Sequence, residues 1–222
     1  MTDSLVTYGL YFLIGQFPNG PLGGLALTIV LGSCALVLAA PLGVLLALAR
    51  ISPWRALRWP MAGLIYVVRG TPLLMVVFWA YFFLPAVTGK KTGQFATMLI
   101  ALAIFNGVYL AEAVRAGIQG IPRGQTEAAR SLGLSYGQTL RRIVLPQALR
   151  NMLPSLVNQF VTTLKETSLG YIIGLQETAF IASQINSQVI VHPVAIYSSL
   201  GLTFFVLCFG LARLAGRLGV RN

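Results

Sequence analysis

Five long apolar runs constrain this chain more than any other feature of its sequence. They cover about residues 24–49, 59–84, 95–116, 152–175 and 194–215. A helix needs roughly 20 apolar residues to cross the hydrocarbon core of a bilayer, so each run is long enough to span one. Only 9% of the residues are charged and 56% are hydrophobic, whereas about a quarter are charged in a soluble domain. We therefore expect an all-α, polytopic membrane protein.

The first 21 residues differ from the rest of the chain. Residues 5–17 are apolar but too few to span, and Pro18, Asn19, Gly20 and Pro21 interrupt them. We expect residues 1–21 to form an interfacial or extracytoplasmic segment and residues 22–222 to form the transmembrane domain.

The basic residues predict how the spans are oriented, because cytosolic loops are rich in lysine and arginine. If the loops after the first, third and fifth spans share a side, the other side keeps only Lys90 and Lys91. We therefore place the N-terminus and the loop 176–193 outside the membrane, and the C-terminus on the cytosolic side. This arrangement accounts for the net charge of +11 without a nucleic-acid partner. The basic residues on the cytosolic side are Arg50, Arg55, Arg58, Arg123, Arg130, Arg141, Arg142, Arg150, Arg217 and Arg221.

The longest departure from apolar composition is the segment 127–146, EAARSLGLSYGQTLRRIVLP. It is typical of two short helices joined by a turn, with Gly133 in the left-handed position that ends the first helix. Ser135 and Gln138 have the spacing of a capping box that opens the second helix. Pro146 is expected to interrupt that second helix. Because long spans flank the segment, it should protrude into water and meet a partner there.

The same segment carries a family resemblance. Its spacing, Glu-Ala-Ala, three residues, Gly, nine residues, Ile-x-Leu-Pro, resembles the signature loop of the membrane subunits of bacterial ATP-binding-cassette (ABC) importers. The stretches VRGTPLL (68–74), YLAEAVRAGI (109–118) and LKETSL (164–169) are similar to the permeases that take up polar amino acids. The resemblance implies a type I importer permease fold with about five transmembrane helices and a cytosolic coupling helix within the loop 123–146. The matching residues are Glu127, Ala128, Ala129, Gly133, Ile143, Leu145 and Pro146.

The resemblance also implies partners. The coupling helix would dock in a groove on an ATPase subunit, with Glu127 as its charged anchor and with Ala128 and Ala129 allowing close approach. The complete importer would contain an ATPase dimer, a second permease that is an identical copy or a paralogue, and a periplasmic or extracellular solute-binding protein. The substrate would be a polar amino acid, with glutamate, aspartate or glutamine preferred.

This chain is not expected to hydrolyse ATP itself, because it has no G-x-x-x-x-G-K-[ST] sequence. ATP and Mg²⁺ would be bound by the partner ATPase, and this chain would hold no cofactor. No H-E-x-x-H sequence is present and the chain has five acidic residues in all, so we expect neither a metal site nor an enzyme. A secondary transporter or channel that works without an ATPase is the alternative function.

Ionisable residues within the spans are costly and are therefore candidates for a translocation cavity. Arg69 and Lys165 could meet a substrate carboxylate, or Arg69 could instead pair with an acid such as Glu166. Glu112 and Arg115, three residues apart, are expected to form a structural pair. The complete set of cavity candidates is Arg69, Thr71, Asn106, Thr162, Lys165, Glu166, Thr167 and Ser168.

Overall fold

The computed structural model describes residues 2–188 and 193–219, with side chains for 8–188 and 193–214. Every named secondary-structure element within these residues is a helix, as the sequence predicted. The helices are α1 (Thr2–Ile14), α2 (Gly24–Ile51), α3 (Arg55–Gly70), α4 (Leu73–Thr88), α5 (Gln94–Gln119), α6 (Arg123–Ser131), α7 (Tyr136–Thr139), η1 (Leu140–Val144), α8 (Leu145–Asn151), α9 (Leu153–Glu166), η2 (Thr167–Ile173), α10 (Thr178–Gln188) and α11 (Pro193–Gly219).

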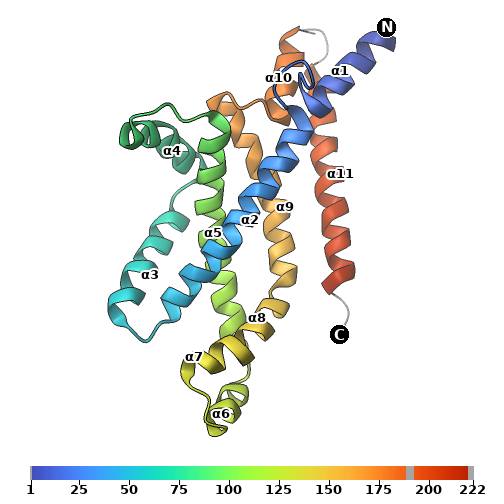
Figure 1. Cartoon of the computed structure of the whole chain (residues 1–222). Helices are drawn as coiled ribbons and strands as arrows, with labels where there is room; N and C mark the ends of the chain where they lie inside the picture. The colour runs from blue at the N-terminus through green and yellow to red at the C-terminus, as the bar shows by residue number, and fades with distance from the viewer. Residues whose placement is uncertain (1, 189–192, 220–222) are drawn as a thin grey trace.

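The long helices form an elongated bundle with short helices at its two ends (Figure 1). Helices α2 and α5 cross at the centre, α3 and α4 lie on one side, and α9 and α11 lie on the other. Helices α6, α7 and α8 form one end, which we call the polar knob and define as residues 121–151. Helices α1 and α10 lie at the opposite end.

Two of the five predicted spans are interrupted. Among the described residues, α2, α5 and residues 193–214 of α11 are long and apolar enough to cross a membrane. Helices α3 and α4 are bent by 107° relative to each other. They provide a fourth span only if the two helices together are taken as a single broken span. Pro72 explains the break, since a residue before proline is pushed to extended backbone, and Thr71 has φ −100° and ψ 135°. The fourth predicted span is α9, of 14 residues, continued by the tighter 3₁₀ helix η2.

The helices α2 and α5 approach closely because glycines stand where they cross. A Cβ on Gly43 would lie 2.7 Å from the Cβ of Leu110, and one on Gly107 would lie 2.8 Å from a methyl group of Leu42. In a membrane, helices associate through such close packing, because lipid tails supply no hydrophobic drive between them. The buried core therefore follows α5, which carries more buried residues than any other helix described.

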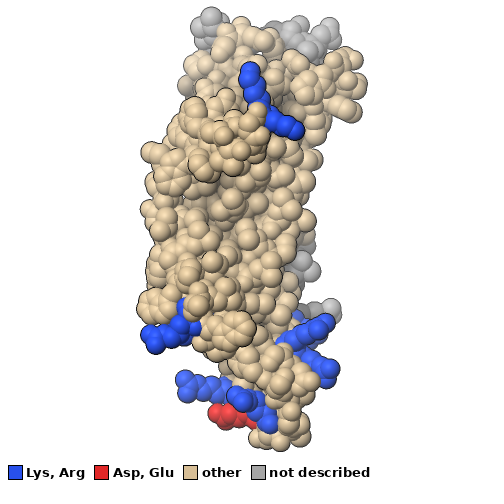
Figure 2. Space-filling view, turned by 60° about the vertical axis from the view of Figure 1, so that its left-hand side comes forward, with Lys and Arg blue, Asp and Glu red and all other residues tan. Residues whose placement is uncertain are grey.

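On the face that Figure 2 shows, charged side chains gather at the ends of the bundle. Figure 2 shows lysine and arginine side chains at both ends of the molecule, with a middle zone free of charge on the visible face. This distribution fits a body that crosses a membrane. Of the predicted cytosolic set, Arg221 and the side chain of Arg217 lie outside the described residues. The predicted outer loop 176–193 holds α10, and its residues 189–192 are likewise outside them.

Glu177, which the sequence analysis did not single out, holds the end opposite the polar knob together. Its side chain is fully buried. One carboxylate oxygen accepts a hydrogen bond from the backbone N–H of Ala179 at 2.8 Å and the other from Phe180 at 2.9 Å, so that the side chain caps α10. Next to it, the N–H of Gly24 donates to the carbonyl of Gln176 at 2.9 Å. Glu177 thus fixes the start of α10, and the adjoining Gln176 carbonyl holds this segment beside the start of α2.

Burial raises the pKa of Glu177 from 4.5 to about 7, because the ionised form loses its hydration, although the two backbone N–H groups oppose the rise. A carboxyl group whose pKa is raised on folding stabilises the fold when protonated. That contribution is fully present below pH 4.5 and is lost as the pH rises through about 7.

We predict that the variant Glu177→Gln removes this pH dependence, because an amide stays neutral and keeps one acceptor oxygen. Each unit of pKa difference corresponds to about 1.4 kcal/mol. Thermal unfolding of the purified protein in detergent should show the unmodified chain losing melting temperature, relative to Glu177→Gln, as the pH rises from about 4.5 to about 7. Parallel melting curves across that range would contradict the prediction.

Candidate functional site

The polar knob has the two short helices and the turn that the sequence predicted. Gly133 has a positive φ of 83°, and its N–H donates to the carbonyl of Arg130 at 2.9 Å, which closes α6. Ser135 and Gln138 form the predicted capping box: the N–H of Ser135 donates to the side chain of Gln138 at 2.9 Å, and the N–H of Gln138 donates to the hydroxyl of Ser135 at 3.3 Å. These bonds satisfy backbone groups that would otherwise be left free at the helix start.

The prediction that Pro146 interrupts the second helix is wrong, because the helical path continues past it. The chain passes from α7 through one π-helical turn, η1, into α8. Pro146 has no N–H to offer the carbonyl of Arg142, and its ring would clash with that carbonyl in a regular α-helix. The N–H of Leu145 instead donates to the carbonyl of Leu140, five residues earlier, which widens the turn and lets the helix continue.

The signature residues of the polar knob divide into outward-facing and inward-facing groups. Glu127 and Ala128 are exposed, whereas Ala129 is buried with 5% exposure. The small side chain of Ala129 therefore allows the segment after α6 to approach it closely. The carbonyl of Ala129 accepts a hydrogen bond from the N–H of Leu134 at 3.2 Å. Glu127 forms no ion pair with a described residue. The remaining signature residues are exposed (Gly133, Pro146) or half-buried (Ile143, Leu145).

A second group of polar side chains lies between α5 and α9, inside the bundle. The amide nitrogen of Asn106 donates to a carboxylate oxygen of Glu166 at 3.0 Å. The amide oxygen of Asn106 accepts from the hydroxyl of Thr163 at 2.9 Å and from the amide of Gln159. We call these four residues the polar cluster. Asn106 and Thr163 are fully buried, while Gln159 and Glu166 are half-buried at its rim.

The structure brings together two of the predicted cavity residues, Asn106 and Glu166, and adds two that the sequence analysis missed. Gln159 and Thr163 could have been found from their spacing, because residues 159, 163 and 166 share one face of a helix. The other candidates do not join the cluster. Thr71, Thr167 and Ser168 bond to backbone carbonyls of their own helices, and Thr162 and Lys165 are exposed.

Glu112 is the centre of an ion-pair group on α5. A carboxylate oxygen lies 2.8 Å from a guanidinium nitrogen of Arg50, and the other lies 2.9 Å from Arg115. The predicted pair of Glu112 and Arg115 is thus present. Arg69 lies 3.8 Å from Glu112, so the acid that faces it is Glu112, and the pairing of Arg69 with Glu166 considered from the sequence is wrong. Arg69 also stacks over the ring of Tyr109, 5.3 Å from its centroid.

The part of the chain that the structure describes has no group of three or more His, Cys, Asp or Glu side chains placed to hold a metal ion.

Comparison with known proteins identifies the relatives of this arrangement. Residues 39–221 match the family described as "Binding-protein-dependent transport system inner membrane component". The chain is 38% identical over 201 residues to the probable glutamine ABC transporter permease protein of Bacillus subtilis (strain 168), with 90% of this chain and 92% of the relative covered. It is 35% identical to the arginine transport system permease protein of the same organism, with 84% of each chain covered. It is 33% identical to the glutamate/aspartate import permease protein of Escherichia coli O6:H1, with 75% of this chain and 78% of the relative covered.

Solved structures agree over nearly the whole chain. A structure titled "Crystal structure of an amino acid ABC transporter with histidines" superposes with a TM-score of 0.86 at 31% identity, covering 99% of this chain and 98% of that one. An inward-facing form of the MetNI methionine ABC transporter gives a TM-score of 0.68 at 23% identity, covering 88% and 90%. This second likeness shows a shared fold.

We predict that Glu112→Gln destabilises the protein by about 3 kcal/mol, because it leaves Arg50 and Arg115 in a half-buried site without a counter-charge. Thermal unfolding in detergent measures the loss. The double variant Arg50→Met with Glu112→Gln should recover part of it, since the most buried cation is then gone as well. If Glu112→Gln melts like the unmodified chain, Glu112 does not hold the arginines.

Proposed function

The chain belongs to the family of binding-protein-dependent transport system inner membrane components, and we propose that it forms half of the translocation pathway of an ATP-driven importer for a polar amino acid. Like its relatives, it is the permease of an amino-acid ABC importer. It is therefore a transport subunit and not an enzyme. The observation that carries this conclusion is similarity along the whole chain, in sequence to several amino-acid permeases and in shape to an amino-acid ABC transporter.

The subunit lies in the bacterial inner membrane. We propose that its polar knob faces the cytosol and that its α10 end faces outward. The support is the charge distribution: the polar knob carries five arginines, whereas the loop after α4 carries only Lys90 and Lys91. Lysine and arginine accumulate on the cytosolic side of membrane proteins.

The polar knob is the proposed docking surface for an ATPase subunit. Glu127 and Ala128 present a negative charge beside a small apolar surface, and both are exposed. An exposed carboxylate without a partner in the described chain is suited to meet a cation on the ATPase. ATP binding would close the ATPase dimer and move two docked knobs together, which would switch the pathway between its two openings. Two knobs require a second permease, and a solute-binding protein would deliver the substrate from outside.

The polar cluster is the proposed contact with substrate inside the membrane. An amino acid is a zwitterion, so its ammonium group needs an anion and its carboxylate needs a cation. Glu166 offers an anion at the half-buried rim of the cluster, and the neighbouring Lys165 is exposed and in no ion pair with a described residue. Arg69 is the weaker candidate for the carboxylate, because it already faces Glu112 and Tyr109.

For the substrate we propose glutamate, aspartate or glutamine. Relatives named for glutamine and for glutamate and aspartate support this choice. A relative named for arginine, at 35% identity, lies between the glutamine relative at 38% and the glutamate/aspartate relative at 33%, so overall identity does not separate acidic from basic amino acids. The uptake measurements below therefore use a panel of labelled amino acids.

We predict that Glu127→Lys abolishes ATP-dependent uptake and binding of the ATPase, because it places a cation where the docking groove expects an anion. The measurement is uptake of labelled glutamine, glutamate, aspartate and arginine into proteoliposomes that contain the permease, its ATPase and its binding protein. The control Asn151→Lys adds a positive charge to an exposed position elsewhere on the polar knob and should leave uptake intact. Uptake that persists without ATP and with Glu127→Lys would favour a secondary transporter instead.

We predict that Glu166→Gln lowers uptake about tenfold or more while ATPase binding is unchanged. The amide oxygen of glutamine can still accept the hydrogen bond from Asn106, but the charge that would hold the substrate ammonium group is lost, and a charged contact contributes more than about 1.4 kcal/mol. Ser168→Ala is the matched control, because the Ser168 hydroxyl donates only to the Lys165 carbonyl. Equal uptake by Glu166→Gln and the unmodified chain would remove Glu166 from the pathway.

A further inference from the structure

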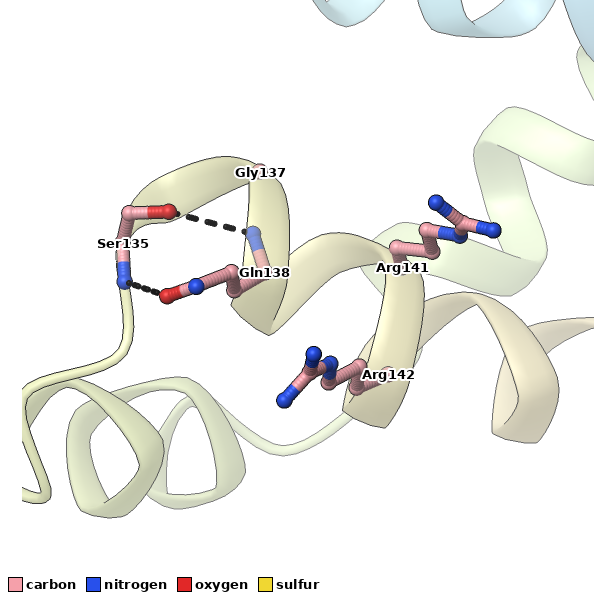
Figure 3. A pocket seen from close by; sticks show the side chains of 5 residues that line it. All are labelled: Ser135, Gly137, Gln138, Arg141 and Arg142. Carbon is pink, nitrogen blue, oxygen red and sulfur yellow. Dashed lines mark hydrogen bonds between the residues drawn. The ribbon is translucent and has the colours of Figure 1, made fainter.

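A hollow in the polar knob lies beside the proposed docking helix α6. Its volume is about 610 Å³, and it is lined by Ser135, Gly137, Gln138, Arg141 and Arg142 (Figure 3). Ser135 and Gln138 are occupied by each other through the capping box. The two arginines are the charged groups that line this hollow.

The π-helical turn η1 sets the position of both arginines. Arg141 and Arg142 are adjacent in this turn, which Pro146 imposes on the backbone. A π-helical turn holds more residues than an α-helical turn, so successive side chains are separated by a smaller angle around the axis. Both side chains line the hollow, and Figure 3 shows them reaching out from the turn in different directions.

Both guanidinium groups lack a counter-charge. Arg141 and Arg142 are exposed, and neither forms an ion pair with a residue that the structure describes. Two cations on adjacent residues repel each other, and nearby anions would relieve that repulsion. The polar knob has too few acids to neutralise its cations. Glu127 is its single acidic residue, whereas it contains five arginines: Arg123, Arg130, Arg141, Arg142 and Arg150.

We propose that Arg141 and Arg142 bind carboxylate side chains of the ATPase subunit and so form a second docking contact, opposite in sign to that of Glu127. This inference rests on the proposed function. Its location supports it, because η1 packs directly against α6, the helix that carries Glu127 and Ala128. A protein that covers the exposed face of α6 is therefore within reach of the hollow.

Carboxylates fit this hollow better than other partners of a cytosolic surface. The guanidinium group has a planar fork of donors that matches a carboxylate in two parallel hydrogen bonds. Complementary charges also accelerate docking and fix its orientation. One charged anchor would let the polar knob rotate in its groove, whereas an anionic and a cationic contact together define a single orientation. Such a contact is needed if rigid-body motion of the ATPase is to move the permease.

The test compares ATPase binding by permease variants in nanodiscs of zwitterionic lipid. We expect the double variant Arg141→Gln with Arg142→Gln to bind the ATPase subunit about tenfold more weakly or worse. Its association rate should also lose most of its dependence on salt concentration, because exposed charges that steer association are screened by salt. The double variant Arg141→Lys with Arg142→Lys keeps the charges and should retain much of the affinity. Arg150→Gln, at the far end of α8, is the matched control and should bind like the unmodified chain.

The outcomes separate this inference from the proposed function. If Glu127→Lys abolishes binding while the double glutamine variant binds normally, the second contact is wrong and the docking role of the polar knob stands. If none of these variants affects binding, the proposed coupling surface fails as well. If the double glutamine variant loses affinity only in nanodiscs that contain anionic lipid, the arginines bind lipid headgroups and the inference is overturned. Unchanged melting temperatures would show that the variants are folded.

Discussion

The close crossing of α2 and α5 is the contact on which the rest of the structure depends. In hydrocarbon each backbone polar group must be satisfied within a helix, so the bundle can gain stability only from contacts between helices. Gly43 and Gly107 allow that contact, and Gly107 is the neighbour of Asn106. The same helix α5 therefore provides the crossing, the centre of the polar cluster and, at Glu112, the acid that holds the ion-pair group.

The arginines of this chain fall into two classes with different roles. Arg50, Arg69 and Arg115 surround Glu112 within the chain, where removing the acid would leave buried charge uncompensated. Arg141 and Arg142 are exposed beside a hollow in the polar knob and have no described counter-charge. The first class serves the fold of a single subunit. The second class suits a surface that is completed by another protein.

Irregular helical turns connect the two proposed functional regions. From Tyr136 to Thr167 the backbone stays in the right-handed helical region through α7, η1, α8, Met152 and α9. The π-helical turn that precedes Pro146 keeps this path helical. Gln159, Thr163 and Glu166 lie on the last part of the path, so one nearly continuous helical segment joins the polar knob to the polar cluster.

The sequence by itself determined the features that depend on neighbouring residues: the apolar spans, the capping box of Ser135 and Gln138, the left-handed turn at Gly133 and the spacing that reveals the family. Only the tertiary structure decided which distant residues meet. It paired Arg69 with Glu112, joined Gln159 and Thr163 to Asn106, and turned Ala129 inward. It also showed a sharp bend at Thr71–Pro72 and a continued helix at Pro146, although both sites contain proline. The physical reason is that a local pattern sets the conformation of the backbone, whereas the partner of a side chain is set by how separate helices pack.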